Sequence, residues 1–345
     1  MSPSVDYQHY LNLVSRSFSF CIERLNSPLK EKIGLSYLLF RVLDTIEDAE
    51  WTDQGQKNYF FNLFEKSLHE PFDKNNQNAW LNNFSAHIPD HEKELLKIAN
   101  NLFFDFQNLE ENDRKSLSNA LVIMKNGMQH FSIKNNELKL HNLKEVNQYC
   151  FFVAGIIGEL LTNFISGFTQ VNYSHTVYTN SFHFGLFLQK INILKDQIND
   201  EKEGRYLVPN REQVLLSLKK NSVGALKYLT AIPLELKEYR LFCAWSLFLG
   251  LSSLSFINSS WKNKLIDKIP RALTLNLLSQ VESLIDDNSL IEQFFAKLSS
   301  SLALTQTQIL NSSTDVSNIS LSDEWFLKTY VGKLNMSDLS ALDVI

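Results

Sequence analysis

The chain has 345 residues, and 44% of them are hydrophobic, which is enough for a substantial core. A formal net charge of -5 without a long Lys/Arg block excludes the basic surface typical of nucleic-acid-binding proteins, so we expect no nucleic-acid partner. Three widely spaced cysteines without a CxxC motif favour neither a disulfide framework nor a zinc site, and they indicate a reducing cytoplasm.

Glycine and proline are scarce, and apolar residues recur at helical spacing instead of alternating, so we predict an all-α helical bundle. The first residues do not contain a basic region followed by an apolar region, so we expect no secretory signal. Helix starts are predicted at Ser27-Pro28 and near Asp53, Asp90 and Asn142, where capping residues or proline occur. We expect one domain over residues 1–345, with a loosely attached C-terminal segment from about residue 311 that is rich in Ser, Thr and Asn.

The predicted helix of residues 28–50 has an apolar face and, on its other side, a polar stripe. Tyr37, Arg41, Asp44 and Asp48 lie at offsets 0, 4, 7 and 11, which drift only about 20° around the helix axis. A single stripe of this kind most often marks a solvated helix face.

A second helix with the same construction follows about 150 residues later, in residues 184–209. Gln189, Asn192, Asp196 and Asp200 lie at offsets 0, 3, 7 and 11 and again form one stripe. The neutral Gln and Asn add polar groups that a merely soluble face does not need. Two such stripes favour a binding site over two solvated faces.

Each stripe contains an Asp pair at i and i+4, where like charges repel unless a cation intervenes. Hard oxygen ligands suit Mg²⁺, with Mn²⁺ as an alternative, and Mg²⁺ completes its coordination with water and phosphate oxygens. The implied substrate is a diphosphate. Arg16, Arg41, Lys195 and Arg205 are candidates to hold the leaving pyrophosphate, whose charge neutralisation lowers the barrier to C–O ionisation.

Five stretches resemble the squalene and phytoene synthases, and most closely the squalene synthases. They are "SRSFSF" (15–20), "YLLFRVLDTIED" (37–48), "YCFFVAGIIGELL" (149–161), "GLFLQKINILKDQIND" (185–200) and "GRYLVP" (204–209). They follow the family's order and approximate spacing. The resemblance spans roughly residues 10 to 260 and implies the class I isoprenoid-synthase fold, a helical bundle around a central cavity.

The resemblance implies an Mg²⁺-dependent condensation of two farnesyl diphosphates through presqualene diphosphate to squalene, with reduction by NADPH. The near alternative is a dehydrosqualene or phytoene synthase, which ends by proton loss and needs no reductant. A non-catalytic homologue that acts as an assembly protein is the alternative from another class.

The resemblance also implies roles for individual residues. The metal ligands are Asp44, Glu47, Asp48, Asn192, Asp196 and Asp200, and all four aspartates count as catalytic. Tyr149 is the candidate proton acceptor of the first half-reaction, and Tyr37 lines the site. Diphosphate or NADPH phosphate contacts are assigned to Arg16, Arg41, Lys195 and Lys268. Substrate contacts are assigned to Ser15, Ser17, Phe18, Val153, Gly155, Gln189, Asn192 and Arg205.

The sequence departs from the family pattern at several positions. Asn199 stands where the second acidic motif usually has Glu. Lys195 stands where many relatives have Arg, so a single ammonium replaces a guanidinium that could bind phosphate through two nitrogens. Residues 242–247, "FCAWSL", lack the proline of the corresponding family segment. NADPH binding by Lys268 depends on a loose match of "KIPR" (268–271) to the family's basic flap.

Two glycines of the third stretch, Gly155 and Gly158, each cost a helix about 1 kcal/mol relative to Ala. They either leave room for a prenyl chain or permit close helix packing, and the sequence leaves both open.

The most apolar run, residues 241–257, contains serines and is at the short limit for spanning a bilayer, so we predict a buried core helix. The charged C-terminal end predicts no transmembrane anchor. We therefore expect a monomeric cytoplasmic protein that contacts membranes peripherally to release an apolar product.

Overall fold

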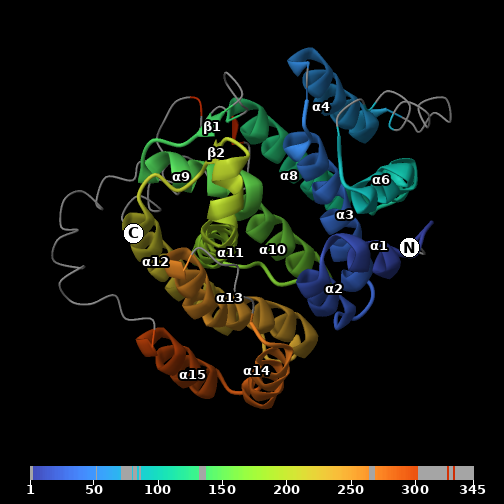
Figure 1. Ribbon diagram of the computed structural model, residues 1–345. Coiled ribbons are helices and arrows are strands. Elements are labelled where there is room, and N and C mark those ends of the chain that lie inside the picture. The colour runs from blue at the N-terminus through green and yellow to red at the C-terminus, as the bar shows by residue number, and fades with distance from the viewer. Residues whose placement is uncertain are drawn as a thin grey trace. The chain divides into compact units, whose positions relative to one another are not determined.

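The computed structural model describes residues 3–51, 53–70, 80, 84, 87–131, 137–263, 269–301, 325, 329 and 330 (Figure 1). The chain forms two compact units, and each is described by itself. Unit 1 consists of Met1–His130 and Asn163–Asn172, and unit 2 consists of Phe131–Thr162 and Tyr173–Ile345.

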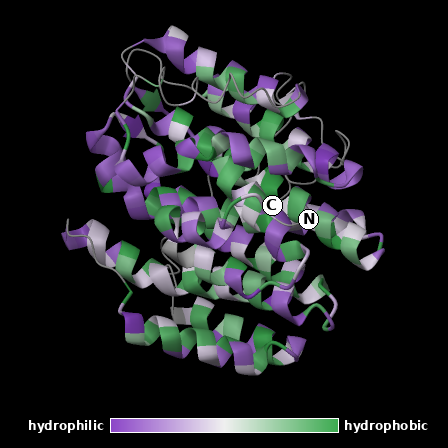
Figure 2. Cartoon of the chain, turned by 90° about the vertical axis from the view of Figure 1, so that its right-hand side faces the viewer, coloured by the Kyte–Doolittle hydropathy of each residue, from purple (hydrophilic) through white to green (hydrophobic). Residues whose placement is uncertain are grey.

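Helices dominate both units, which confirms the all-α prediction. Among the described residues, extended structure is limited to one isolated bridge and to a parallel pair of two-residue strands, β1 (Leu138–Lys139) and β2 (Arg205–Tyr206). In Figure 2, apolar and polar residues alternate around most helices, as expected where one helix side packs against a core.

Unit 1 is organised around the helix predicted for residues 28–50. Its helices are α1 (Tyr7–Val14), α2 (Arg16–Glu23), α3 (Leu29–Asp48), α4 (Gln54–His69), α6 (Asp90–Lys97), α7 (Ala99–Gln107) and α8 (Glu111–His130). The central helix α3 packs against the other six. Its apolar face is the core of the unit, since Leu38, Leu39, Val42 and Ile46 are completely buried.

The predicted helix starts agree with the structure to within about a residue, as expected of helix boundaries. Helix α3 begins at Leu29, immediately after Pro28. The Asp53 side chain caps α4 by accepting a hydrogen bond from the Gly55 N–H at 2.8 Å.

Unit 2 is organised around the helix that carries the second acidic motif. Its elements are α9 (Leu143–Cys150), a π-helical turn (Phe151–Gly155), the first half of α10 (Ile156–Thr169), α11 (His175–Lys202), α12 (Arg211–Ala231), α13 (Lys237–Asn263), α14 (Arg271–Leu284) and α15 (Asn288–Ser301). Helix α11 packs against α9, the π-helical turn, α12 and α13. The Asn142 side chain caps α9, as predicted, by accepting from the Glu145 N–H at 3.0 Å.

Close helix packing explains the two glycines that the sequence left open. A Cβ atom on Gly158 would lie 2.1 Å from the backbone oxygen of Ser181 in α11. A Cβ atom on Gly155 would lie 2.8 Å from the Leu186 side chain. Because neighbouring atoms already occupy both positions, these glycines let the helices approach, and no empty volume for a prenyl chain is needed to account for them.

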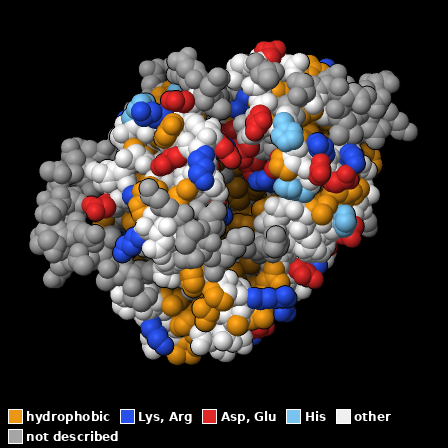
Figure 3. Space-filling model, viewed as in Figure 1, with side chains coloured by type: hydrophobic (Ala, Val, Ile, Leu, Met, Phe, Trp, Pro, Cys, Tyr) orange, Lys and Arg blue, Asp and Glu red, His pale blue; other side chains and the backbone are white. Residues whose placement is uncertain are grey.

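Helix α13 contains the apolar run of residues 241–257 and is a core helix, as predicted, with most of its side chains buried. Two helical stretches, Leu143–Thr169 and Lys237–Asn263, are long and apolar enough to cross a membrane by length and composition, a criterion that buried core helices also meet. Hydrophobic side chains reach the surface in the lower part of Figure 3. Leu273 and Leu275 of α14 are more than half exposed.

Candidate functional site

The first acidic motif lies at the C-terminal end of α3 in unit 1. The Asp44 side chain is 36% exposed, and Asp48, one turn later, is exposed as well. Glu47, by contrast, is only 8% exposed because it projects from the side of α3 that faces the core. The two aspartates are therefore accessible together, and the ligand role of Glu47 stays a prediction.

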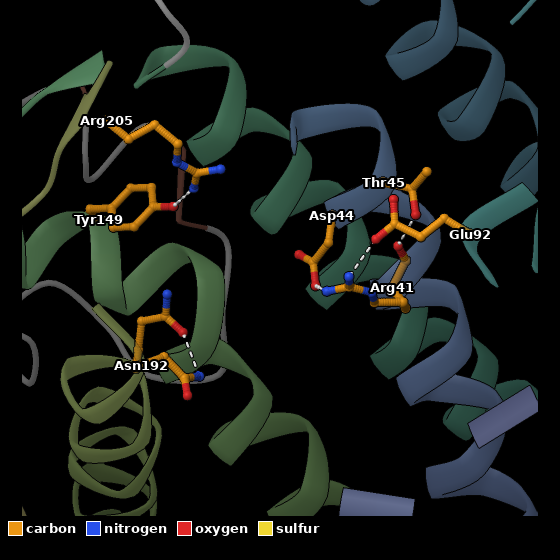
Figure 4. Close-up of polar contacts among 8 residues, drawn as sticks. Arg41, Asp44, Thr45, Glu92, Tyr149, Asn192 and Arg205 are labelled. Carbon is orange, nitrogen blue, oxygen red and sulfur yellow. Dashed lines mark hydrogen bonds and ion pairs between the residues drawn. The ribbon is translucent and has the colours of Figure 1, made fainter. Parts of the chain in front are cut away.

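Arg41 of the same stripe lies between two carboxylates (Figure 4). Its guanidinium is 3.7 Å from the Asp44 carboxylate and forms a second, closer ion pair with Glu92 of α6. Burial alone would lower the pKa of Arg41, but the charges of Asp44 and Glu92 outweigh it and raise that pKa. The buried Nε–H of Arg41 has no acceptor among the described residues, so one donor remains available for an anion.

Glu92 is not among the predicted site residues, although it is 5% exposed and holds the Arg41 guanidinium. It is 51 residues away from Arg41 along the chain, in a helix of ordinary charged composition. No spacing pattern in the sequence could have paired the two residues.

The start of α2 brings three more predicted residues together. The Ser15 hydroxyl caps α2 by accepting a hydrogen bond from the Phe18 N–H at 3.4 Å, and the Phe18 ring centroid lies 5.7 Å from that of Tyr37. Burial raises the pKa of Tyr37, while a hydrogen bond with Ser15 and the charge of Arg41 oppose the rise. Arg16 and Ser17 are predicted from the same motif to contact phosphate and substrate, and their side chains lie outside the described part of the structure.

The second acidic motif lies on α11 in unit 2. Its predicted residues Gln189, Asn192, Asp196 and Asp200 are all partly exposed. The Asn192 amide donates to the Gln189 side-chain oxygen at 3.5 Å (Figure 4), and the Lys195 ammonium lies 3.2 Å from the Asp196 carboxylate. The stripe therefore forms one accessible polar side of α11, as its spacing predicted.

Tyr149 and Arg205, predicted from separate motifs, meet in unit 2 (Figure 4). Tyr149 is 2% exposed, and its hydroxyl oxygen accepts a hydrogen bond from an Arg205 Nη at 3.4 Å. The parallel pairing of β1 with β2 fixes the backbone of Arg205 opposite Leu138. The π-helical turn that follows Tyr149 contains Val153, which is 9% exposed, and such turns occur frequently at functional sites.

The donor groups suit a metal that needs few protein ligands. Within the part of the chain that the structure describes, no three of His, Cys, Asp and Glu lie close enough together to hold a metal ion by themselves. Mg²⁺ takes one or two carboxylates and fills its other positions with water and phosphate oxygens. The accessible Asp pair of each motif fits that requirement. Lys268, the predicted NADPH ligand, lies outside the described residues.

A buried lysine beside the second motif is also absent from the predicted site. Lys190 is completely buried, and its ammonium donates to Ser217 Oγ at 2.6 Å and to Asn221 Oδ1 at 2.5 Å, both on α12. Burial lowers its pKa to about 8. Its place between the buried Phe187 and Leu194 at helical spacing is the sequence signal that could have indicated a buried ammonium.

Comparison with known protein families gives a match over much of the chain. The model of the squalene/phytoene synthase family matches residues 11–213, which include both acidic motifs. A squalene synthase of Mycosarcoma maydis is 33% identical over 208 residues, covering 59% of this chain and 34% of that protein. Squalene synthase ERG9 of Saccharomyces cerevisiae is 25% identical over 360 residues, covering 94% of this chain and 77% of that protein. The matches with the first relatives span less than half of those proteins' length.

Solved structures share the fold. A structure of TcSQS in complex with the ligand E5700 has a TM-score of 0.73 at 21% identity, covering 88% of this chain and 94% of that chain. A dehydrosqualene synthase in complex with a ligand has a TM-score of 0.57 at 16% identity, covering 81% of this chain and 95% of that chain. The helical isoprenoid-synthase fold expected from the sequence motifs is therefore confirmed.

Proposed function

Because the chain belongs to the squalene/phytoene synthase family, we propose that it is a prenyltransferase of the squalene synthase type. It condenses two farnesyl diphosphates head to head through presqualene diphosphate to squalene, with Mg²⁺ and NADPH. The observation that carries this proposal is the accessibility of both aspartate pairs, Asp44 with Asp48 and Asp196 with Asp200, each on a helix otherwise built into a core.

The residues of unit 1 supply the groups that a diphosphate needs. Asp44 and Asp48 would hold Mg²⁺, which, when bound, neutralises the charge that develops on the departing diphosphate. The free Nε–H of Arg41 donates to a diphosphate oxygen. Glu92 keeps the guanidinium in place while the anion binds, because the ion pair engages a different nitrogen.

In unit 2, Tyr149 is the proton acceptor of the first half-reaction. Its hydroxyl oxygen accepts a hydrogen bond from Arg205, which fixes the position of that oxygen. Burial of the ring excludes water from the oxygen that receives the proton. Asn192, Asp196 and Asp200, on α11 of the same unit, would hold Mg²⁺.

NADPH use, the membrane contact and the monomeric state are parts of the same proposal. The reductant depends on the sequence resemblance, since its predicted ligand Lys268 lies outside the described residues. A squalene product is apolar and has to leave the protein for a lipid bilayer, so peripheral contact with a membrane follows from the chemistry of the product.

Incubation of the purified protein with farnesyl diphosphate and Mg²⁺, with and without NADPH, tests the proposal. Mass spectrometry of the hydrocarbon is expected to show squalene only with NADPH. Dehydrosqualene under both conditions, or phytoene when geranylgeranyl diphosphate replaces farnesyl diphosphate, would instead assign the reductant-free alternative. Absence of pyrophosphate release under both conditions would refute an enzymatic role and favour an assembly protein.

Substitutions of the aspartates test the metal assignment. Asp48→Ala and Asp196→Ala should each abolish pyrophosphate release without changing the circular dichroism spectrum, because both carboxylates are accessible and carry no core packing. Glu212→Ala, which removes an exposed carboxylate from α12, is the matched control and should keep full activity. Retained activity in both aspartate variants would contradict the assignment.

A further inference from the structure

Two aromatic residues near the C-terminus contact the family motif around Tyr149. The Trp325 ring lies 5.5 Å from the Phe152 ring, at an interplanar angle of 34°. Trp325 also meets Phe131 edge-on, with centroids 5.6 Å apart, and Phe131 meets Tyr149 edge-on at 5.7 Å. All four residues belong to unit 2. A row of rings thus runs from Trp325 through Phe131 to the proposed proton acceptor.

Tyr330 anchors this part of the chain. Its side chain is 6% exposed, and its hydroxyl donates to the Glu159 carboxylate at 2.8 Å. Its ring packs against Phe151 at 5.4 Å and against Phe182 at 6.2 Å. A hydrogen bond to a buried carboxylate is costly to lose, and the ring contacts add buried apolar area, so this contact is specific.

Trp325 and Phe131 are more exposed than the other rings around them. Phe152 is completely buried and Tyr330 nearly so, whereas Trp325 and Phe131 are both only partly buried. Each of these two rings therefore keeps some solvent-exposed area in addition to its ring contacts. The exposed parts of aromatic rings can pack against a hydrocarbon chain, and an aromatic ring can also stabilise a cation that forms over it.

We propose that Trp325, held by the Tyr330 anchor, determines which prenyl chain length the protein binds. Its indole and the Phe131 ring form a wall against which the prenyl chain beside Tyr149 packs. This inference rests on the proposed function, because it needs an allylic diphosphate as the ligand. It adds a specificity-determining residue from a segment beyond the residues that the family model matches, which end at 213.

Binding of unreactive thiodiphosphate analogues tests the proposal. Titration calorimetry gives the Kd of the farnesyl analogue and of the geranylgeranyl analogue, which is one isoprene unit longer. Trp325→Ala should shift the ratio of the two Kd values by about tenfold toward the longer analogue, since burying a few extra carbon atoms suffices for such a change. Trp325→Phe keeps a ring at the position and should shift the ratio by less than about threefold.

Trp261→Ala is the matched control, because it truncates another partly exposed tryptophan of unit 2, 37% exposed on α13, and should leave the ratio unchanged. If Trp325→Ala loses its helical circular dichroism, Trp325→Leu replaces it and should shift the ratio in the same direction. An unchanged ratio in the folded variant overturns the role of Trp325 while wild-type turnover still supports the proposed function. If the wild type shows neither binding nor turnover, the proposed function itself is refuted, and this inference with it.

Discussion

Replacing Lys190 with methionine removes the buried ammonium group of α11 and keeps an unbranched side chain of similar length. The ammonium is completely buried, and among the described residues it donates only to neutral oxygen acceptors, those of Ser217 and Asn221. Burial opposes the charged form, and the pKa falls from its ordinary 10.5 to about 8. A fall of this size means that the charged form of Lys190 destabilises the folded protein by roughly 3 kcal/mol.

The sign of the pH dependence follows from the lowered pKa. Below about pH 8 both the folded and the unfolded chain hold the proton on Lys190, and the destabilisation is fully present. Between about pH 8 and pH 10.5 the unfolded chain holds a proton that the folded chain has released, so stability rises with pH. Between about pH 7.5 and about pH 9.5 the wild type should therefore gain about 2 kcal/mol relative to Lys190→Met.

Urea unfolding followed by circular dichroism at these pH values measures the difference. The buried Cys150 thiol, whose pKa burial raises to about 12, has an opposite pH dependence that begins at pH 9.0, but it is present in both proteins and largely cancels. Lys219→Met, on the exposed side of α12, is the control and should follow the wild type. A difference between wild type and Lys190→Met that stays constant over this range would refute the reasoning.

Two further predictions concern packing and charge. Gly158→Ala should lower the free energy of unfolding by about 1–3 kcal/mol, because its Cβ would lie 2.1 Å from the Ser181 carbonyl oxygen. Gly167→Ala in the same helix meets nothing within 4 Å and should stabilise by up to about 1 kcal/mol, so equal melting temperatures would contradict the packing explanation. Glu92→Gln should destabilise by about 2 kcal/mol in urea unfolding, because it leaves the Arg41 charge partly buried without its closer partner. Unchanged stability would show that this ion pair contributes nothing.

Features that depend on neighbours within a few turns could be predicted from the sequence. The apolar face of α3, the cap at Asn142 and the accessible stripe of α11 all follow from helical periodicity and short-range hydrogen bonding. The acidic stretches of α3 and α11, together with three other sequence stretches, were sufficient to indicate the family. Boundary errors of one residue, as at Pro28, arise because several residues can begin a helix at similar cost.

The partners of the site residues depend on contacts between distant parts of the chain. Arg41 pairs with Glu92 across 51 residues, and Arg205 reaches Tyr149 across 56. Trp325 reaches the same motif from a segment that the sequence marked only as loosely attached. The sequence by itself therefore determined which helices form, which of their sides are apolar and which carboxylates are accessible. Only the tertiary structure decided which charges neutralise each other and which rings surround Tyr149, because packing brings together side chains that no local pattern relates.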